Sequence, residues 1–276
     1  MSAFYNNWWL LPSIIIILVG ILCPAIGAAL VYKKKLLKAN LISATIFPGI
    51  IISIIRDLDP LIGVFVGGVI GALLSELPSF NKNRNAVSVI NIFTMGMIGF
   101  GVSLTPLIPR DAIGIDLETL FFGDVLTSSY GDLARMLASS FVLFIFFFLT
   151  FFISTATCSE FNHQSDPVNP IKAFFYNLFL NITTIFVICS SFPALGLVFV
   201  ITFLSIPTIL GIEKRAPNLP IAMVISSIFG LLISIIGFTI SMIFNLYPGP
   251  AIGVICLILF LARVFIKDFI NIFKNI

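Results

Sequence analysis

Charge is what this sequence lacks most. Only 10% of its 276 residues are charged, whereas 59% are hydrophobic and the mean hydropathy is +1.16. A soluble domain carries about 25% charged residues, enough to cover its surface. The low charge therefore excludes a water-soluble fold. The composition predicts an all-α protein, a polytopic transmembrane helical bundle.

The motifs of soluble enzymes and nucleotide-binding proteins are missing as well. There is no GxxxxGK[ST] phosphate loop, so the chain is not expected to hydrolyse ATP by that mechanism. GxSxG, HExxH and GxGxxG are also absent. The four cysteines have no CxxC spacing and fit the role of small hydrophobic residues. The basic run Lys33–Lys35 is interpreted as a topology and lipid-headgroup cluster, and no nucleic-acid partner is expected.

Charge-free runs identify the candidate spans, because a membrane helix needs about 20 apolar residues. The runs are Met1–Tyr32, Ala39–Ile55, Pro60–Ser75, Asn85–Pro109, Met136–Ser159, Ala173–Ile212 and Ala216–Ala262. The last two are too long for one crossing, and we expect breaks at Ser190–Pro193 and Asn245–Pro250. Nine spans result. Because the second and third are short, eight spans with one re-entrant segment is the alternative.

The basic residues indicate an orientation. If the N-terminus is outside and nine spans alternate, 12 of the 15 Lys and Arg residues lie inside, and only Arg56, Arg110 and Arg135 lie outside. This asymmetry follows the positive-inside rule. The outer side then has a net charge of −4 and the inner side of +7. A negative mouth would concentrate cations, although acidic residues are also simply tolerated outside.

Polar and small residues inside the spans predict how the helices pack. Amide and hydroxyl side chains in hydrocarbon should face other helices or a pathway, and for most of them we expect interhelical hydrogen bonds. They are Asn91, Asn177, Asn181, Thr183, Thr184, Thr202 and Ser205. The Gly-xxx-Gly spacing of Gly63, Gly67 and Gly71 predicts close helix approach. Internal prolines such as Pro24, Pro48 and Pro207 interrupt the backbone hydrogen bonds, and broken helices often line transport paths.

Three segments together resemble the metal-type ABC importer permeases, the membrane subunits of zinc, manganese and iron uptake systems. Leu120–Leu126 resembles the Leu-x-Phe-Gly-Asp-Ile-Leu segment of that family. Gly196 followed by Pro207 resembles its Gly…Pro helix, and Leu246–Ile252 is similar to its Pro-Gly-Pro-Ala-Ile turn. The order and spacing agree over almost the whole chain.

The resemblance implies a single transmembrane permease domain over residues 1–276 in the plasma (inner) membrane of a bacterium. It implies a homodimer with a second permease copy, two cytoplasmic ATPase subunits that bind ATP, and an extracytoplasmic metal-binding protein. The chain itself would be no enzyme and would bind no cofactor, and its cargo would be a divalent metal ion. The polar inside loop Ser159–Ile171 would contact the ATPase, although a plain connector is an equal alternative. The contact residues would be Asn162, His163, Asp166, Pro167 and Asn169.

The second span departs from the family pattern Asp-x-x-Ser-His-x-x-x-Pro-Gly. Asn40 stands in place of Asp and Ala44 in place of His, whereas Ser43, Pro48 and Gly49 are retained. Imidazole suits zinc, and oxygen donors suit manganese. The remaining oxygen candidates for metal binding are Asn40, Ser43, Asp116, Glu118 and Asp124.

Three explanations of this departure remain open. The pathway needs no tight site, the ligands come from elsewhere, or the chain has diverged to another substrate or lost transport. An ATP-independent carrier or channel is the alternative function.

Overall fold

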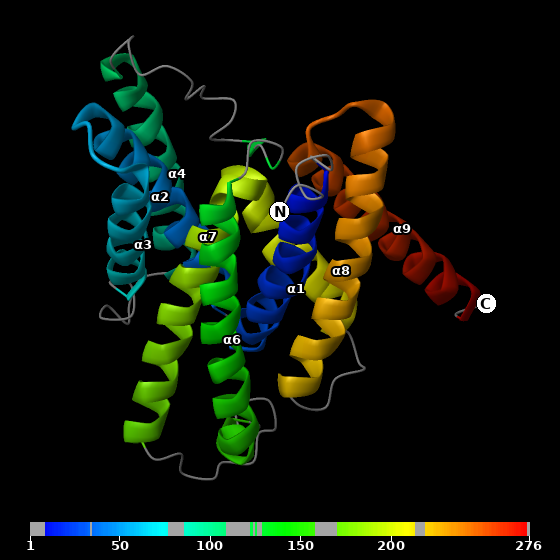
Figure 1. Ribbon diagram of the computed structural model, residues 1–276. Helices are drawn as coiled ribbons and strands as arrows, with labels where there is room; N and C mark the ends of the chain where they lie inside the picture. The colour runs from blue at the N-terminus through cyan, green and yellow to red at the C-terminus, as the bar shows by residue number, and fades with distance from the viewer. Residues whose placement is uncertain are drawn as a thin grey trace.

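The described part of the chain is helical throughout. The computed structural model describes residues 9–33, 35–76, 86–108, 122–123, 125, 129–157, 170–212 and 219–274, and contains no strand within them. The helices are α1 (Leu10–Tyr32), α2 (Leu36–Ile55), α3 (Pro60–Glu76), α4 (Ala86–Leu104), α6 (Tyr130–Thr157), α7 (Pro170–Ile212), α8 (Leu219–Phe244) and α9 (Pro248–Lys274). This confirms the all-α prediction (Figure 1).

The helices match the expected spans. Within the described residues, five stretches are long and apolar enough to cross a membrane: α1, α2, Val87–Leu107, Tyr130–Thr150 and α8. Shorter apolar helices cover Ile62–Glu76, Tyr176–Phe192, Phe199–Gly211 and Pro248–Arg263. Each candidate span of the sequence therefore holds a helix, which is consistent with eight to nine crossings.

One break lies away from its expected place. The chain is helical through Ser190–Phe192 and changes direction at Gly196, where φ is 71° and ψ is 171°. Only glycine adopts this conformation without strain, so the reversal occurs where glycine stands and not at the preceding Ser-Ser-Phe-Pro run. The other break is where we expected it: Asn245 has φ 51°, and Pro248 begins α9.

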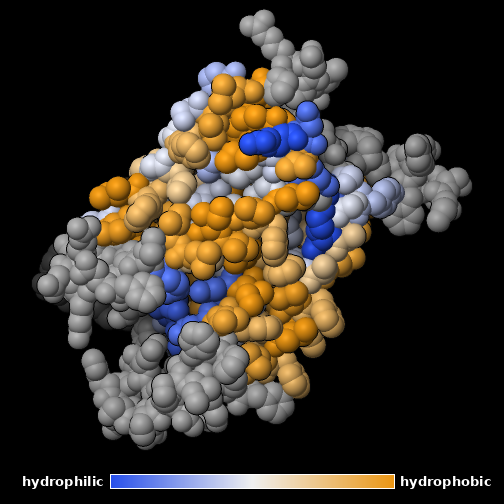
Figure 2. Space-filling view, turned by 90° about the vertical axis from the view of Figure 1, so that its left-hand side faces the viewer, coloured by the Kyte–Doolittle hydropathy of each residue, from blue (hydrophilic) through white to orange (hydrophobic). Residues whose placement is uncertain are grey.

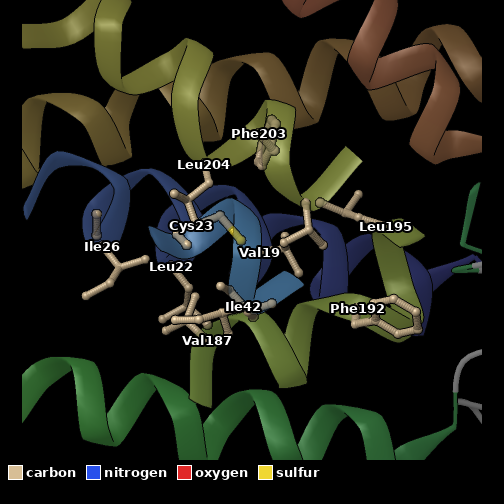
Figure 3. Packing of buried hydrophobic residues seen from close by; sticks show 14 of the residues in the cluster. Val19, Leu22, Cys23, Ile26, Ile42, Val187, Phe192, Leu195, Phe203 and Leu204 are labelled. Atoms are coloured by element: carbon tan, nitrogen blue, oxygen red, sulfur yellow. The ribbon is translucent and has the colours of Figure 1, made fainter. Parts of the chain in front are cut away.

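Helix α1 forms the centre of the core, between the two limbs of α7 (170–195 and 197–212). Figure 3 shows Val19 and Cys23 of α1 between Phe192 of the first limb and Leu204 of the second. The Cys23 thiol donates to Ser191 Oγ at 3.3 Å. These contacts tie α1 to both limbs through buried apolar side chains.

Helix α1 continues through Pro24 and uses the resulting defect for packing. Proline has no backbone N–H, so the carbonyl of Gly20 lacks its usual helical donor. A Cβ atom at Gly230 of α8 would collide with this carbonyl and with the Pro24 ring. On the other side, Thr208 Oγ1 donates to the Pro24 carbonyl at 3.1 Å. Gly230 therefore lets α8 approach α1 closely at this defect. Thr208 shares its proton between the Pro24 carbonyl and the Leu204 carbonyl of its own helix, the latter at 2.9 Å.

Helices α2, α3 and α4 pack into a group that we call the α2–α4 block, on the left in Figure 1. A Cβ atom at Gly63 would collide with the Gly49 carbonyl, and one at Gly67 would lie 2.6 Å from the Thr45 carbonyl. The α4 helix packs its Gly101 against the Phe47 ring. The close approach predicted from glycine spacing is thus confirmed.

The side of the molecule that includes this block is mainly apolar. Figure 2 shows a broad hydrophobic surface with small separate hydrophilic patches. On α3 the exposed apolar side chains include Ile62, Phe65, Val66, Ile70 and Leu73. Such a face fits contact with lipid tails.

Candidate functional site

The three sequence segments that carry the family resemblance meet at one end of the bundle. A Cβ atom at Gly249 would collide with the carbonyl oxygen of Phe122 and would lie 3.0 Å from that of Leu195. The rings of Phe122 and Phe199 lie beside this glycine with centroids 6.0 Å apart. The segments therefore form one site through close backbone approach, which we call the motif junction (Phe122, Leu195, Phe199 and Gly249).

Glycine also sets the backbone path at the motif junction. Gly123 has φ 70° and Gly196 has φ 71°, a region that residues with a Cβ atom rarely enter. Val125 follows and is fully buried. The backbone conformation therefore requires glycine in the Phe-Gly-Asp segment and in the Gly…Pro helix. The sequence alone did not reveal this requirement.

The α2 segment that departs from the family pattern is packed inside the protein. Ala44 is fully buried and Asn40 is partly buried. Ser43 is buried, and its hydroxyl donates to the Ala39 carbonyl of the same helix at 3.1 Å. A methyl group therefore fills the place of the family's imidazole.

No acidic or thiol cluster replaces the missing ligands in the described part of the chain. Within it, no group of three or more His, Cys, Asp and Glu side chains is close enough to hold a metal ion. The other predicted site residues lie outside the described residues. They are Asp116, Glu118 and Asp124 among the metal candidates, and Asn162, His163, Asp166, Pro167 and Asn169 in the ATPase contact.

A polar cluster at the opposite end of the bundle joins three helices. Lys38 Nζ of α2 lies 2.8 Å from Glu76 Oε2 at the end of α3. Asn181 Nδ2 of α7 donates to Glu76 Oε1 at 3.3 Å, and Lys35 Nζ donates to Asn177 Oδ1 at 3.0 Å. We call these five residues the inner polar cluster. The sequence does not predict this pairing, because lysines at the end of an apolar run indicate only the topology.

The predicted interhelical hydrogen bonds form in part. Asn177 and Asn181 make them, as expected. Thr184 donates instead to the carbonyl of Leu180 in its own helix at 2.8 Å. Thr183 and Ser205 also bond within α7. A short hydroxyl in hydrocarbon reaches the carbonyl four residues earlier more easily than another helix.

The fold is that of a known class of membrane protein. The chain superimposes on the solved structure "PsaBC from Streptococcus pneumoniae in complex with Fab" with a TM-score of 0.75 and 22% identity. The alignment covers 95% of this chain and 94% of the other. This likeness defines a helical permease fold.

The sequence comparison identifies the family. The model of the ABC 3 transport family matches residues 9–267, and the chain belongs to this family. It is 28% identical over 252 residues to the manganese transport system membrane protein MntC of Halalkalibacterium halodurans, covering 88% of this chain and 82% of that protein. It is 25% identical over 239 residues to the chelated iron transport system membrane protein YfeD of Yersinia pestis, with 87% and 78% covered. The chain is therefore a multi-pass membrane subunit of a transporter and not an enzyme, and ATP hydrolysis is the task of a partner.

Proposed function

We propose that this chain is the permease subunit of an ATP-driven importer whose cargo is a divalent transition metal, manganese or iron. The family match over residues 9–267 carries the proposal. The relatives named for manganese and for chelated iron supply the metals. Hydrolysis of ATP on a partner chain drives alternating access. Zinc, which the resemblance also implies, is not in the names of these relatives.

The ligands of the pathway are assigned to oxygen atoms of α2. Asn40 offers an amide oxygen, and Ser43 donates its proton to Ala39 and keeps a lone pair for a cation. Pro48 has no N–H, so the Ala44 carbonyl lacks its helical donor. Backbone carbonyls freed in broken helices coordinate ions in transporters. Neutral oxygen donors of this kind favour manganese over zinc, and Asp116, Glu118 and Asp124 are proposed as further oxygen donors on the outer side.

A second copy of the chain is proposed to cover the exposed side of α4. Asn91 is exposed there, one turn into the apolar span Val87–Leu107, and an amide that faces lipid tails is costly. A Cβ atom at Gly96 or Gly99 would meet nothing within 4 Å. A partner helix can therefore approach this face closely and offer Asn91 a hydrogen-bond partner.

The orientation follows from charge. We place the inner polar cluster in the cytoplasm, because its lysines belong to the basic side. The N-terminus is then outside.

The loop with Asn162, His163 and Asp166 contacts the ATPase, and the motif junction faces the metal-binding protein. Residues 1–276 act as one permease domain in the plasma membrane.

Elemental content tests the function. Cells with and without the chain, grown under metal limitation, are compared by mass spectrometry. We expect a selective fall in manganese or iron that the wild-type chain restores. Asn40→Ala should fail to restore it, whereas Thr239→Ala should succeed, since Thr239 is exposed and bonds only within its own helix.

The outcomes separate the two parts of the proposal. Unchanged content of every metal on deletion contradicts metal import itself and favours another substrate or a non-transporting role. Full restoration by Asn40→Ala contradicts only the assignment of the α2 ligands.

A further inference from the structure

Within the α2–α4 block, helices α2 and α3 are held rigidly together. These two helices touch backbone to backbone: a Cβ atom at Gly49 would lie 3.1 Å from the Gly67 Cα atom, and one at Gly71 would lie 2.8 Å from the Ile42 Cα atom. Backbone atoms cannot rotate away as a flexible side chain can. Any large movement of α2 must therefore carry α3 with it.

At the inner end this block is joined to α7 by charged and polar bonds. Glu76 of α3 accepts from Asn181 of α7 and pairs with Lys38 of α2. Lys35, at the start of α2, donates to Asn177, one turn earlier on α7. The inner polar cluster thus links the block to α7 at two successive turns.

Toward the other end the described part of the same boundary has no charged bond, although α3 still packs closely on α7 at Gly68, where a Cβ atom would lie 3.1 Å from Ile185 Cγ2. A cavity of about 190 Å³ lies between α3, α6 and α7, lined by Val64, Phe65, Arg135, Ala138, Phe186 and Cys189 among others. The contacts across it are weak. The rings of Phe65 and Phe186 meet edge to face at 6.2 Å, and the Cys189 thiol reaches the Val64 carbonyl at 3.6 Å. Empty volume gives α3 room to move against α7.

We propose that the inner polar cluster is the pivot on which the α2–α4 block rocks against α7, with Glu76 as its positioning residue. Helix α7 begins at Pro170, within the last residues of the segment Ser159–Ile171 assigned to the ATPase, and reaches Asn177 and Asn181 of the cluster within about three turns. When the ATPase displaces α7, the cluster holds α2 and α3 to α7 at this point, so the block turns about Glu76 and its far end moves. Asn40 follows Lys38 by two residues and therefore stays near the pivot. This inference rests on the proposed function.

The coupling ratio tests the role of Glu76. The complete transporter, permease with its ATPase, is placed in liposomes, and manganese uptake and ATP hydrolysis are measured together. Lys38→Met and Glu76→Gln should each lower the manganese carried per ATP by about threefold to fivefold, the effect of losing a partly exposed ion pair. The rate of ATP hydrolysis should stay within about twofold of the wild-type rate. If hydrolysis itself needed this bond, its loss would lower the rate by more than that.

Two control variants make the result specific. Lys38→Arg keeps the charge and should keep the ratio. Arg263→Met removes a basic residue that bonds the Ile209 carbonyl outside the cluster, and it should keep the ratio too. A parallel fall of uptake and hydrolysis in Glu76→Gln would show a merely structural role and would overturn the proposal, as would an unchanged ratio. If the wild-type complex carries neither manganese nor iron, the proposed function fails instead.

Distances between spin labels test the pivot directly. Labels at exposed Leu73 of α3 and Leu178 of α7 report on the boundary near the cluster, and labels at exposed Ile62 of α3 and Tyr130 of α6 report on the far end. During ATP turnover, the Ile62–Tyr130 distance should change while the Leu73–Leu178 distance stays fixed. Movement at the cluster with a fixed far end would refute the pivot.

Discussion

Replacing Gly63 with alanine tests whether direct backbone contact holds α2 against α3. The added methyl group would lie 2.7 Å from the Gly49 carbonyl carbon and would also collide with that carbonyl's oxygen and with Ser53 Oγ. Because the Gly49 atoms are backbone, the helices must separate, and such overpacking costs about 1–3 kcal/mol. The better helix propensity of alanine offsets about 1 kcal/mol. We expect a net loss of up to about 2 kcal/mol, which lowers Tm by up to roughly 8 °C in a chain of this size.

Thermal unfolding in detergent can be followed with a thiol-reactive dye, because Cys23 and Cys256 are buried and react when the fold opens. The matched control is Gly131→Ala. Its methyl group would meet only Ser129 Oγ and Arg135 Nη2, at 3.3 and 3.5 Å, so Tm should be unchanged or higher. If Gly63→Ala unfolds at or above the temperature of this control, the contact does not depend on backbone approach.

Three further substitutions test separate contacts. Gly96→Ile should leave the fold of the subunit intact but convert the permease dimer to monomers in native mass spectrometry; a retained dimer would remove α4 from the interface. Pro48→Ala restores an N–H donor to the carbonyl four residues earlier and should lower manganese uptake by at least about tenfold, while Pro24→Ala keeps uptake. Thr208→Val removes one interhelical hydrogen bond, worth about 0.6 kcal/mol in membranes, and should lower Tm by about 1–2 °C. An equal shift in the lipid-exposed Thr239→Val would contradict this last assignment.

The sequence predicted the helices well because membrane spans depend on composition over a long window. A run without charge from Ala39 to Ile55 has only one low-energy structure in hydrocarbon, since every backbone group must be bonded within the helix. The exact reversal in α7 depended instead on one torsion angle. The Ser-Ser-Phe-Pro run around Phe192 contains residues that commonly end helices, but only Gly196 can adopt the required φ. Composition does not show at which of these two positions the chain turns.

The candidate sites were predicted less completely, because they depend on contacts across long sequence separations. The sequence identified Gly249 and the Phe-Gly-Asp segment as separate motifs. Neither motif predicts that the Phe122 carbonyl faces Gly249. Asn181 was expected to bond between helices, but nothing in the sequence paired it with Glu76, or Glu76 with Lys38. What was missing was the packing of α3 between them, which sequence spacing does not encode.

The two ends of the bundle are held together by different forces. At the motif junction, Gly249 leaves no room for a Cβ atom beside the carbonyl oxygens of Phe122 and Leu195, so strength there depends on shape and is insensitive to charge. At the inner polar cluster, Lys38 and Glu76 are only partly buried, with exposures of 15% and 39%, so water and salt on the aqueous side screen their attraction and can change its strength. Substitutions that change volume should therefore act on the motif junction, and substitutions that change charge should act on the cluster. An ATPase that docks beside the cluster can alter its electrostatic environment without disturbing the packed glycines at the far end.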